Sequence, residues 1–189
     1  MIKIYLTRHG ETLENAQGIL QGHLPGHLSE LGKKQALHLR NNLTDTHFDS
    51  IIVSNLKRAI DTAQIFNEQF DLPVIQTPLL SERNWGEFTG VHITDIHVRP
   101  ADFPPGVETP QELQQRAHQF LKFLLENFEK QALLIIGHGY FNRCIMAEIY
   151  DTSPHDIPRW GNTEIRKFTL SKLSKNNLLP QQDGEVSVN

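Results

Sequence analysis

An arginine and a histidine stand side by side near the start of the chain, directly after a short apolar run. Residues 2–6 predict a buried β-strand, so Arg8 and His9 fall where a strand ends and a loop begins. Ligand crevices in α/β sheets open at this end of the strands. The arginine guanidinium is a planar fork for phosphate oxygens, and imidazole is a nitrogen nucleophile near neutral pH. The pair indicates phosphoryl transfer through histidine, although an isolated Arg-His dipeptide also occurs by chance.

Three further residues with suitable chemistry follow other predicted strands. Arg58 lies in the first turns of a helix after the apolar strand 51–53, and Glu82 lies where a third strand, beginning at Pro73, enters an irregular segment. His138 stands between two glycines, after an apolar strand at 132–136. Taken alone, these residues also fit a solvated helix arginine, a loop charge and a helix cap. Because parallel strands end at one edge of a sheet, we expect their side chains to meet the Arg8-His9 pair there.

The elements that must position these residues alternate between strand and helix. A long loop at 8–28 follows the first strand, and Ser29 caps a predicted helix at 30–43 whose apolar stripe begins at Leu31. A second helix carries apolar residues from Leu56 to Phe70 on one side.

The second half of the chain begins with an irregular cap. Five prolines interrupt residues 78–110, where we expect a cap with one short helix near 94–98. A long helix starts at Thr109, another runs from Gly139 to about Tyr150, and a last strand is predicted at 163–170. This order predicts a three-layer α/β/α fold with a mostly parallel central sheet and an irregular cap insertion. We expect one domain at 1–172 and a polar, frayed tail at 173–189.

Composition and charge restrict the possible partners. The 189 residues include 18 basic and 22 acidic side chains, with a formal net charge of -4, which argues against a broad nucleic-acid-binding face. The lone Cys144 excludes an intramolecular disulfide and is expected to be a small core residue. No apolar run has the roughly 20 residues needed to cross a bilayer, and no signal-peptide pattern begins the chain. We expect a cytoplasmic protein without membrane contact.

The ordered set of motifs resembles the histidine phosphatase superfamily, which contains cofactor-dependent phosphoglycerate mutases and small phosphomonoesterases. The resemblance spans about residues 1–170. The motifs that carry it are TRHGET at 7–12 followed by Asn15, LQGH at 20–23, LSELG at 28–32, SNLKRAIDTA at 54–63, LSE at 80–82 with GEFTG at 86–90, and GHG at 137–139.

This resemblance implies a role for each matching residue. His9 would take the phosphoryl group on a ring nitrogen, and Glu82 would act as general acid and then as general base. Arg8, Arg58 and His138 would surround the phosphoryl oxygens. Asn15, Gln21, Gly22 and the backbone at Gly139 are implied as further substrate contacts. No metal or other cofactor is implied, because the side chains supply the positive charge.

Several residues remain open to two interpretations. His23 and His27, and likewise His92 and His97, have spacings that metal sites use, but their loop context disfavours a metal, and His23 fits the pocket rim better. Trp85, Tyr140 and Phe141 either line the pocket or pack in the core.

The activity within the superfamily depends on the segment between Glu82 and His138. Phosphoglycerate mutases carry a longer insertion there, so the short segment favours hydrolysis of a small phosphate ester. A mutase-type phosphotransferase and a catalytically weak module that binds a phosphorylated ligand are the alternatives. A dimer is compatible with the family, but no residue pattern predicts one.

Overall fold

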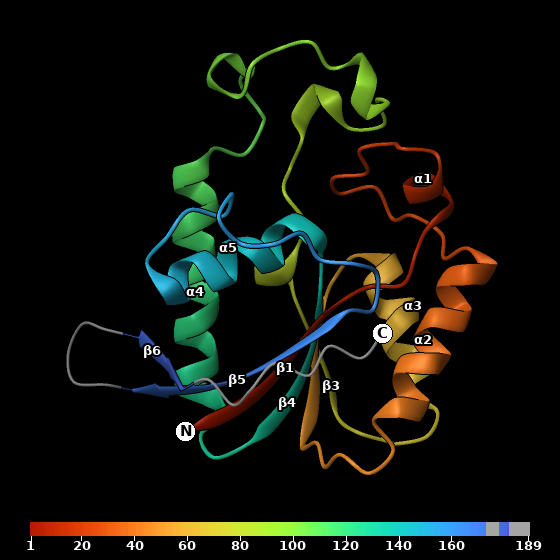
Figure 1. Ribbon diagram of the computed structural model, residues 1–189, viewed down its shortest axis with the longest axis vertical. Helices are drawn as coiled ribbons and strands as arrows, with labels where there is room; N and C mark the ends of the chain where they lie inside the picture. The colour runs from red at the N-terminus through yellow and green to blue at the C-terminus, as the bar shows by residue number, and fades with distance from the viewer. Residues whose placement is uncertain (173–177, 182–189) are drawn as a thin grey trace.

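The computed structural model describes residues 1–172 and 178–181, and one sheet runs through it (Figure 1). The strand order is β3-β2-β4-β1-β5-β6. The strands are β1 (Ile2–Arg8), β2 (Ser50–Ser54), β3 (Val74–Thr77), β4 (Ala132–Gly137), β5 (Ile165–Lys172) and β6 (Leu178–Gln181). The α-helices are α1 (Leu13–Ala16), α2 (Glu30–Asn42), α3 (Lys57–Asn67), α4 (Pro110–Asn127) and α5 (Gly139–Tyr150).

The central strand β4 shows why the fold has three layers. All six of its residues are buried, as an apolar strand covered on both faces requires. Leu133 and Ile135 pack in the core beneath α4 and α5, whereas Leu134 and Ile136 pack in a second core beneath α2 and α3. Figure 1 shows the two helix pairs on opposite faces of the sheet. The predicted three-layer α/β/α fold is confirmed.

Strand pairing places the ends of three strands at one edge. β1 and β2 each pair with β4 in parallel, and β3 pairs with β2 in parallel. Thr7 lies opposite Ile136 in the β1–β4 register, and Val53 lies opposite the same residue in the β2–β4 register. The loops that follow β1, β2 and β4 therefore leave the sheet together, at the end where α1 and the cap lie in Figure 1.

The C-terminal part of the sheet differs from the prediction. The last strand begins two residues later than predicted, at Ile165, and β5 runs antiparallel to β1. The tail expected to be frayed includes β6, which pairs antiparallel with β5. The adjacent leucines at 178 and 179 were a strand signal that the polar composition of the tail obscured. Residues 173–177 and 182–189 lie outside the described part, so the prediction is not tested there.

The helices begin at the expected caps, with local differences. Ser29 accepts a hydrogen bond from the Gly32 N–H and starts α2, but Leu31 is 52% exposed and does not belong to its buried face. The loop at 8–28 contains the short helix α1, which sequence analysis missed. Thr12 and Asn15 form a reciprocal capping box there, so the signal was present in a segment too short for helical periodicity.

The cap is made of short 3₁₀ turns joined by loops, as its prolines indicate. The helix expected near 94–98 is the turn Ile93–Asp95, shifted toward the N-terminus and a single turn long. The cap is tied to the loop after α1: Leu20 N–H donates to Val91 O (2.9 Å) and Gly90 N–H to Leu20 O (2.7 Å). These two segments, distant in sequence, together cover the edge of the sheet where β1 and β4 end (Figure 1).

Candidate active site

Two histidines meet where β1 and β4 end. The His9 N–H donates to Gly137 O at 3.1 Å, which continues the parallel pairing by one residue. His138 follows β4 directly and begins α5. The centroids of the His9 and His138 rings are 5.1 Å apart, and both side chains are buried. The topology thus brings together two histidines that lie far apart in the sequence.

The hydrogen bonds of the His9 ring fix its tautomer. Nδ1 lies 2.7 Å from the Gly10 carbonyl oxygen, which can only accept, so Nδ1 carries the proton. Nε2 lies 3.2 Å from Nε of Arg58, which can only donate, so Nε2 is unprotonated. The lone pair of a nucleophile is therefore on Nε2, beside a guanidinium.

Burial and charge keep His9 neutral. Desolvation lowers its pKa well below the ordinary value, and the neighbouring Arg58 and Arg8 lower it further. The hydrogen bond to Gly10 opposes this shift without reversing it. The imidazole is therefore available as a nucleophile at neutral and mildly acidic pH.

The loop that carries His9 is held from three sides. Thr62 Oγ1 accepts the Gly10 N–H at 3.1 Å, and Asn162 Nδ2 donates to the His9 carbonyl at 3.0 Å. A Cβ built on Gly10 would lie 2.5 Å from Gly32 O of α2, so glycine is needed there for close approach of two backbones. Asn162 was not predicted from the sequence, because one asparagine in a loop carries no recognisable pattern.

Three of the five N–H groups of Arg58 are used at the start of α3, which leaves two for a ligand. Its side chain is 1% exposed, and besides His9 it donates to Leu24 O (2.6 Å) and Gly22 O (2.9 Å). Gly22 has φ +48°, a conformation that favours glycine and turns its carbonyl toward the guanidinium. Burial lowers the pKa of Arg58 to about 10, which leaves it a cation at neutral pH. The loop at 22–24 and the guanidinium therefore hold each other in place.

Arg8 lies at the end of β1, beside the first residue of α5. Its Nη1 donates to Trp160 O at 2.9 Å. The guanidinium also lies close to the Gly139 backbone: a Cβ added to Gly139 would be 3.3 Å from Arg8 Nε. Burial lowers the pKa of Arg8, and the Glu82 carboxylate opposes that shift. Arg8 Nε is buried without a hydrogen-bond partner among the described residues, which leaves one donor for an anion.

Glu82 is anchored at the N-terminus of α5. The N–H groups of Tyr140 and Phe141 donate to its two carboxylate oxygens, each at 3.2 Å, and the Arg83 N–H donates at 2.8 Å. Backbone amides at a helix N-terminus bind anions in this way. The resemblance implies a substrate contact from the backbone at Gly139, which lines the pocket, whereas the next two amides, those of Tyr140 and Phe141, hold the Glu82 carboxylate.

A cavity of about 280 Å³ connects these groups. It is lined by Arg8, His9, Asn15, Ile19, Leu20, Gln21, Gly22, Arg58, Glu82, Trp85, Ile93, Gly139, Tyr140, Arg143, Arg159 and Trp160. Eight of the nine site residues predicted from the sequence are in this lining. The ninth, His138, lies behind it: the ring is fully buried, and its Nε2 lies 2.8 Å from Ser54 Oγ.

The predicted polar contacts differ in what they offer a ligand. Asn15 uses its Oδ1 on the Thr12 N–H (3.4 Å), which leaves its Nδ2 for the pocket. Gln21 donates one Nε2 hydrogen to Thr12 Oγ1 at 2.7 Å and keeps the second. The carbonyl of Gly22 is used on Arg58, so a contact from Gly22 to substrate would have to come from its N–H.

The structure resolves the roles of the three aromatic residues. Trp85 and Tyr140 line the pocket, whereas Phe141 is fully buried in the core beneath α4 and α5. The guanidinium of Arg116 lies 3.7 Å from the centroid of the Phe141 ring. Of the two interpretations left open by the sequence, the pocket is therefore correct for Trp85 and Tyr140 and the core for Phe141.

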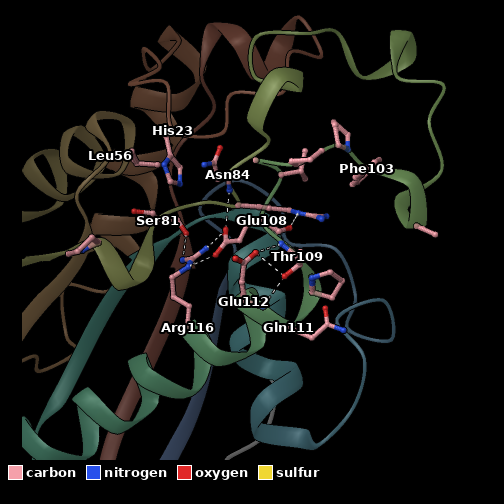
Figure 2. A pocket seen from close by; sticks show the side chains of 18 of the residues that line it. His23, Leu56, Ser81, Asn84, Phe103, Glu108, Thr109, Gln111, Glu112 and Arg116 are labelled. Carbon is pink, nitrogen blue, oxygen red and sulfur yellow. Dashed lines mark hydrogen bonds and ion pairs between the residues drawn. The ribbon is translucent and has the colours of Figure 1, made fainter.

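A second, larger cavity of about 1350 Å³ lies on the other side of the Glu82 segment. Figure 2 shows Arg116 reaching from α4 toward Ser81 and Glu108 at its base. Arg116 binds both oxygens of Glu108 at 2.8 Å and donates to Ser81 O at 2.7 Å. Arg116 thereby ties the backbone next to Glu82 to α4. This positioning role was not predicted from the sequence, because Ser81 and Arg116 are 35 residues apart.

The histidine pairs singled out by spacing do not form a metal cluster among the described residues. His23 Nε2 lies 2.9 Å from the Glu82 carbonyl, at the rim of the larger cavity rather than of the small pocket. His27 pairs with Glu14, with Nδ1 3.3 Å from its carboxylate. Cys144 is buried, and burial raises the pKa of its thiol to about 12, as for a core residue.

Comparison with known proteins agrees with this geometry. The family model of the histidine phosphatase superfamily (branch 1) matches residues 4–176. "Uncharacterized phosphatase PhoE" of Bacillus subtilis is 32% identical over 155 residues, covering 82% of this chain and 80% of that protein. A 2,3-bisphosphoglycerate-dependent phosphoglycerate mutase of Cytophaga hutchinsonii is 27% identical over 208 residues, covering 97% of each. The solved alpha-ribazole phosphatase of Shigella flexneri superimposes with a TM-score of 0.81 at 27% identity, covering 90% of this chain and 91% of that one.

The chain belongs to the histidine phosphatase superfamily, branch 1. Within that superfamily it is an enzyme of the phosphatase type. In the part of the chain that the structure describes, no helix is both long and apolar enough to cross a membrane.

Proposed function

We propose that the chain is a metal-independent phosphomonoesterase that hydrolyses a small phosphorylated metabolite through a phosphohistidine on His9. The observation that carries the proposal is the His9 ring, whose unprotonated Nε2 lies 3.2 Å from Arg58 Nε in the lining of the small pocket. A neutral imidazole with a fixed tautomer is a competent nucleophile, and the neighbouring cation attracts phosphate. For the attack, the Arg58 Nε–H that donates to Nε2 turns to a phosphoryl oxygen, which frees the Nε2 lone pair.

In the first half-reaction, His9 Nε2 attacks phosphorus and the bond from phosphorus to the leaving oxygen breaks. Arg8 and Arg58 stabilise the charge on the phosphoryl oxygens. His138 lies outside the pocket lining and packs beside the His9 ring, with the two ring centroids 5.1 Å apart. Glu82 in its protonated form gives its proton to the leaving alkoxide. The arginines thereby supply the positive charge that a metal ion supplies in other phosphoryl-transfer sites, which is why we propose metal independence.

In the second half-reaction, water attacks the phosphohistidine. Glu82, now a carboxylate, takes a proton from that water, the phosphorus–nitrogen bond breaks, and inorganic phosphate leaves His9 neutral again. The backbone N–H groups of Tyr140 and Phe141 keep the carboxylate in one position through both steps. The same residue therefore serves as acid and then as base.

The volume of the pocket favours a compact substrate. A cavity of about 280 Å³ lies at the small end of the range for ligand sites. Sugar phosphates, phosphoglycerates and nucleotide-derived phosphates such as those named for the alpha-ribazole relatives are the candidate classes. We place the reaction in the cytoplasm, with a free metabolite as partner and neither nucleic acid nor membrane.

A mutase is the second candidate, because a relative named as a phosphoglycerate mutase matches nearly the whole chain. A mutase transfers the phosphoryl group between positions of one substrate and needs a bisphosphate primer. The segment between Glu82 and His138 lacks a long insertion to exclude water from the phosphoenzyme, which favours hydrolysis.

The test is phosphate release from a panel of phosphomonoesters with a metal chelator present, between pH 5 and 8. We expect turnover by the wild type, none by His9→Ala, and unchanged turnover by His47→Ala, which alters an exposed histidine away from the pocket. Equal phosphate release by wild type and His9→Ala would contradict the mechanism. Primer-dependent transfer without net phosphate release would identify a mutase, and tight binding without either reaction would identify a binding module.

A further inference from the structure

The small pocket contains more positive charge than a phosphoryl group requires. Its lining includes four arginines, Arg8, Arg58, Arg143 and Arg159, and a single acidic residue, Glu82. A phosphomonoester carries about two negative charges near neutral pH, which Arg8 and Arg58 balance. Arg143 and Arg159 have no assigned part in phosphoryl transfer, and neither forms an ion pair within the described residues.

Hydrogen bonds hold the backbone of the loop between α5 and β5 on either side of Arg159. Arg143 Nε donates to Ile157 O and Arg8 Nη1 donates to Trp160 O, each at 2.9 Å. Both anchor residues are buried, with Ile157 8% and Trp160 3% exposed, whereas Arg159 between them is exposed. Two arginines of the pocket therefore fix the backbone on either side of a third.

The guanidinium groups of these two residues remain available to a ligand. Arg143 uses its Nε on the loop and lies with Cζ 5.6 Å from the centroid of the Tyr140 ring, which leaves its terminal nitrogens. Arg159 makes no side-chain hydrogen bond in the described part of the chain; its carbonyl accepts from Arg166 instead. Unpaired guanidinium forks at a pocket rim are donors for a planar carboxylate or for a phosphate.

Apart from the four arginines and Glu82, the side chains that line the pocket carry no charge: Asn15, Gln21 and Tyr140 are polar, and the His9 ring is neutral. Ile19, Leu20, Ile93 and Trp85 come from the loop after α1 and from the cap, and all are apolar or aromatic. Arginine is therefore the charged group that this lining offers to the part of the substrate beyond the phosphoryl group.

We propose that Arg143 and Arg159 form a subsite for a second anionic group of the substrate, a carboxylate or a second phosphate. This inference rests on the proposed function, because it takes the phosphoryl position beside His9 as given. It restricts the substrate class to small phosphate esters that carry another negative charge.

The test measures binding rather than turnover, so that it stands apart from the test of hydrolysis. Titration calorimetry on His9→Ala compares phosphoserine with phosphoethanolamine, which lacks the carboxylate, and fructose 1,6-bisphosphate with fructose 6-phosphate. We expect at least one doubly anionic ligand to bind roughly tenfold or more tightly than its partner, as a charge-assisted hydrogen bond implies. The pair that shows the preference identifies the second anion as carboxylate or phosphate.

Arg159→Gln in the same background is expected to weaken binding of the doubly anionic ligand roughly tenfold and to leave its partner unchanged. Arg99→Gln is the matched control, since Arg99 is an exposed cap arginine that pairs with Asp102 and lies outside the pocket lining. Equal affinity within both pairs, a preference that survives Arg159→Gln, or no binding of any of the four ligands would overturn the subsite. The proposed hydrolysis is tested by the separate phosphate-release assay, so a failure of the subsite can be told apart from a failure of the proposed function.

Discussion

At the level of single residues, the two hydrogen bonds of the His9 ring decide which nitrogen can react. The Gly10 carbonyl can only accept and the Arg58 guanidinium can only donate, so each partner allows one protonation state. In a neutral imidazole, a hydrogen-bond partner on one nitrogen fixes which nitrogen carries the proton. The identity of that partner, the next backbone carbonyl, comes from the tight turn after β1.

Replacing Arg58 by lysine tests the guanidinium fork. Lysine keeps the charge but replaces three directed donors, to His9, Leu24 and Gly22, by one ammonium group. We expect kcat/KM to fall roughly 10²–10³-fold, as when one preorganised stabiliser of a transition state is lost. The matched control is Lys57→Met, since Lys57 is the neighbouring exposed cation and pairs with Asp61. Near-normal kcat/KM in Arg58→Lys would mean that charge alone suffices.

Replacing Glu82 by glutamine tests the proton transfer. Glutamine cannot protonate a leaving alkoxide, so hydrolysis of an alkyl phosphate should slow by roughly 10²–10⁴-fold. The rate of phosphoenzyme formation from p-nitrophenyl phosphate should change much less, because p-nitrophenolate leaves without a proton. For Glu82→Gln we therefore expect a burst of nitrophenolate release followed by slow steady-state turnover. The same loss of rate with both substrates would contradict the assignment of Glu82 as general acid.

At the level of elements, the site depends on contacts between segments that are distant in sequence. The N-terminus of α5 holds Glu82 through two backbone N–H groups, and Arg116 on α4 holds the carbonyls of Leu79 and Ser81 just before it. The local signals of the helices, their caps and apolar stripes, were readable from the sequence. Which backbone amides face which carboxylate was not, because that depends on how α4 and α5 pack against the cap.

Arg116→Lys tests whether α4 positions Glu82. Lysine keeps one charge opposite Glu108 but loses the bidentate pair and the bonds to the Glu82 segment. We expect kcat to fall by about tenfold or more with KM little changed, because small displacements of a catalytic group are costly. The free energy of unfolding should fall by roughly 1–3 kcal/mol. Arg40→Lys is the control, since Arg40 pairs with Glu68 and Ile65 O on the far side of the sheet.

At the level of the whole molecule, the order of elements was enough to predict the three layers and the edge where the reactive residues meet. Buried runs such as 132–136 and capped amphipathic helices each agree with that fold. The sequence did not reveal the edge strand β6, the short helix α1 or the antiparallel sense of β5. These depend on short segments whose pairing is decided by tertiary contacts, for which local patterns are weak.

The two buried neutral histidines make stability depend on pH. Burial lowers the pKa of both His9 and His138 well below 6.5, and the positive charge of Arg58 lowers both pKa values further. Below pH 6.5 the unfolded chain binds protons that the folded chain does not, so the free energy of unfolding falls as the pH falls. Each residue contributes a slope of up to about 1.4 kcal/mol per pH unit.

Urea unfolding at intervals between pH 7 and 5 measures this slope. We expect His138→Gln to show a smaller slope than the wild type, by about one histidine, while His47→Gln leaves it unchanged because His47 is exposed. Stability that does not vary over this range, or an unchanged slope in His138→Gln, would show that the two rings are not held neutral.

The most direct test of the central claim is to trap the phosphoenzyme. Rapid quenching with ³²P-labelled substrate under alkaline, denaturing conditions should leave close to one label per active chain, stable to alkali and lost in acid. Peptide mapping should place it on His9, at Nε2, and His9→Ala should take up none. Turnover without a trapped label, or equal labelling of His9→Ala, would contradict a phosphohistidine on His9.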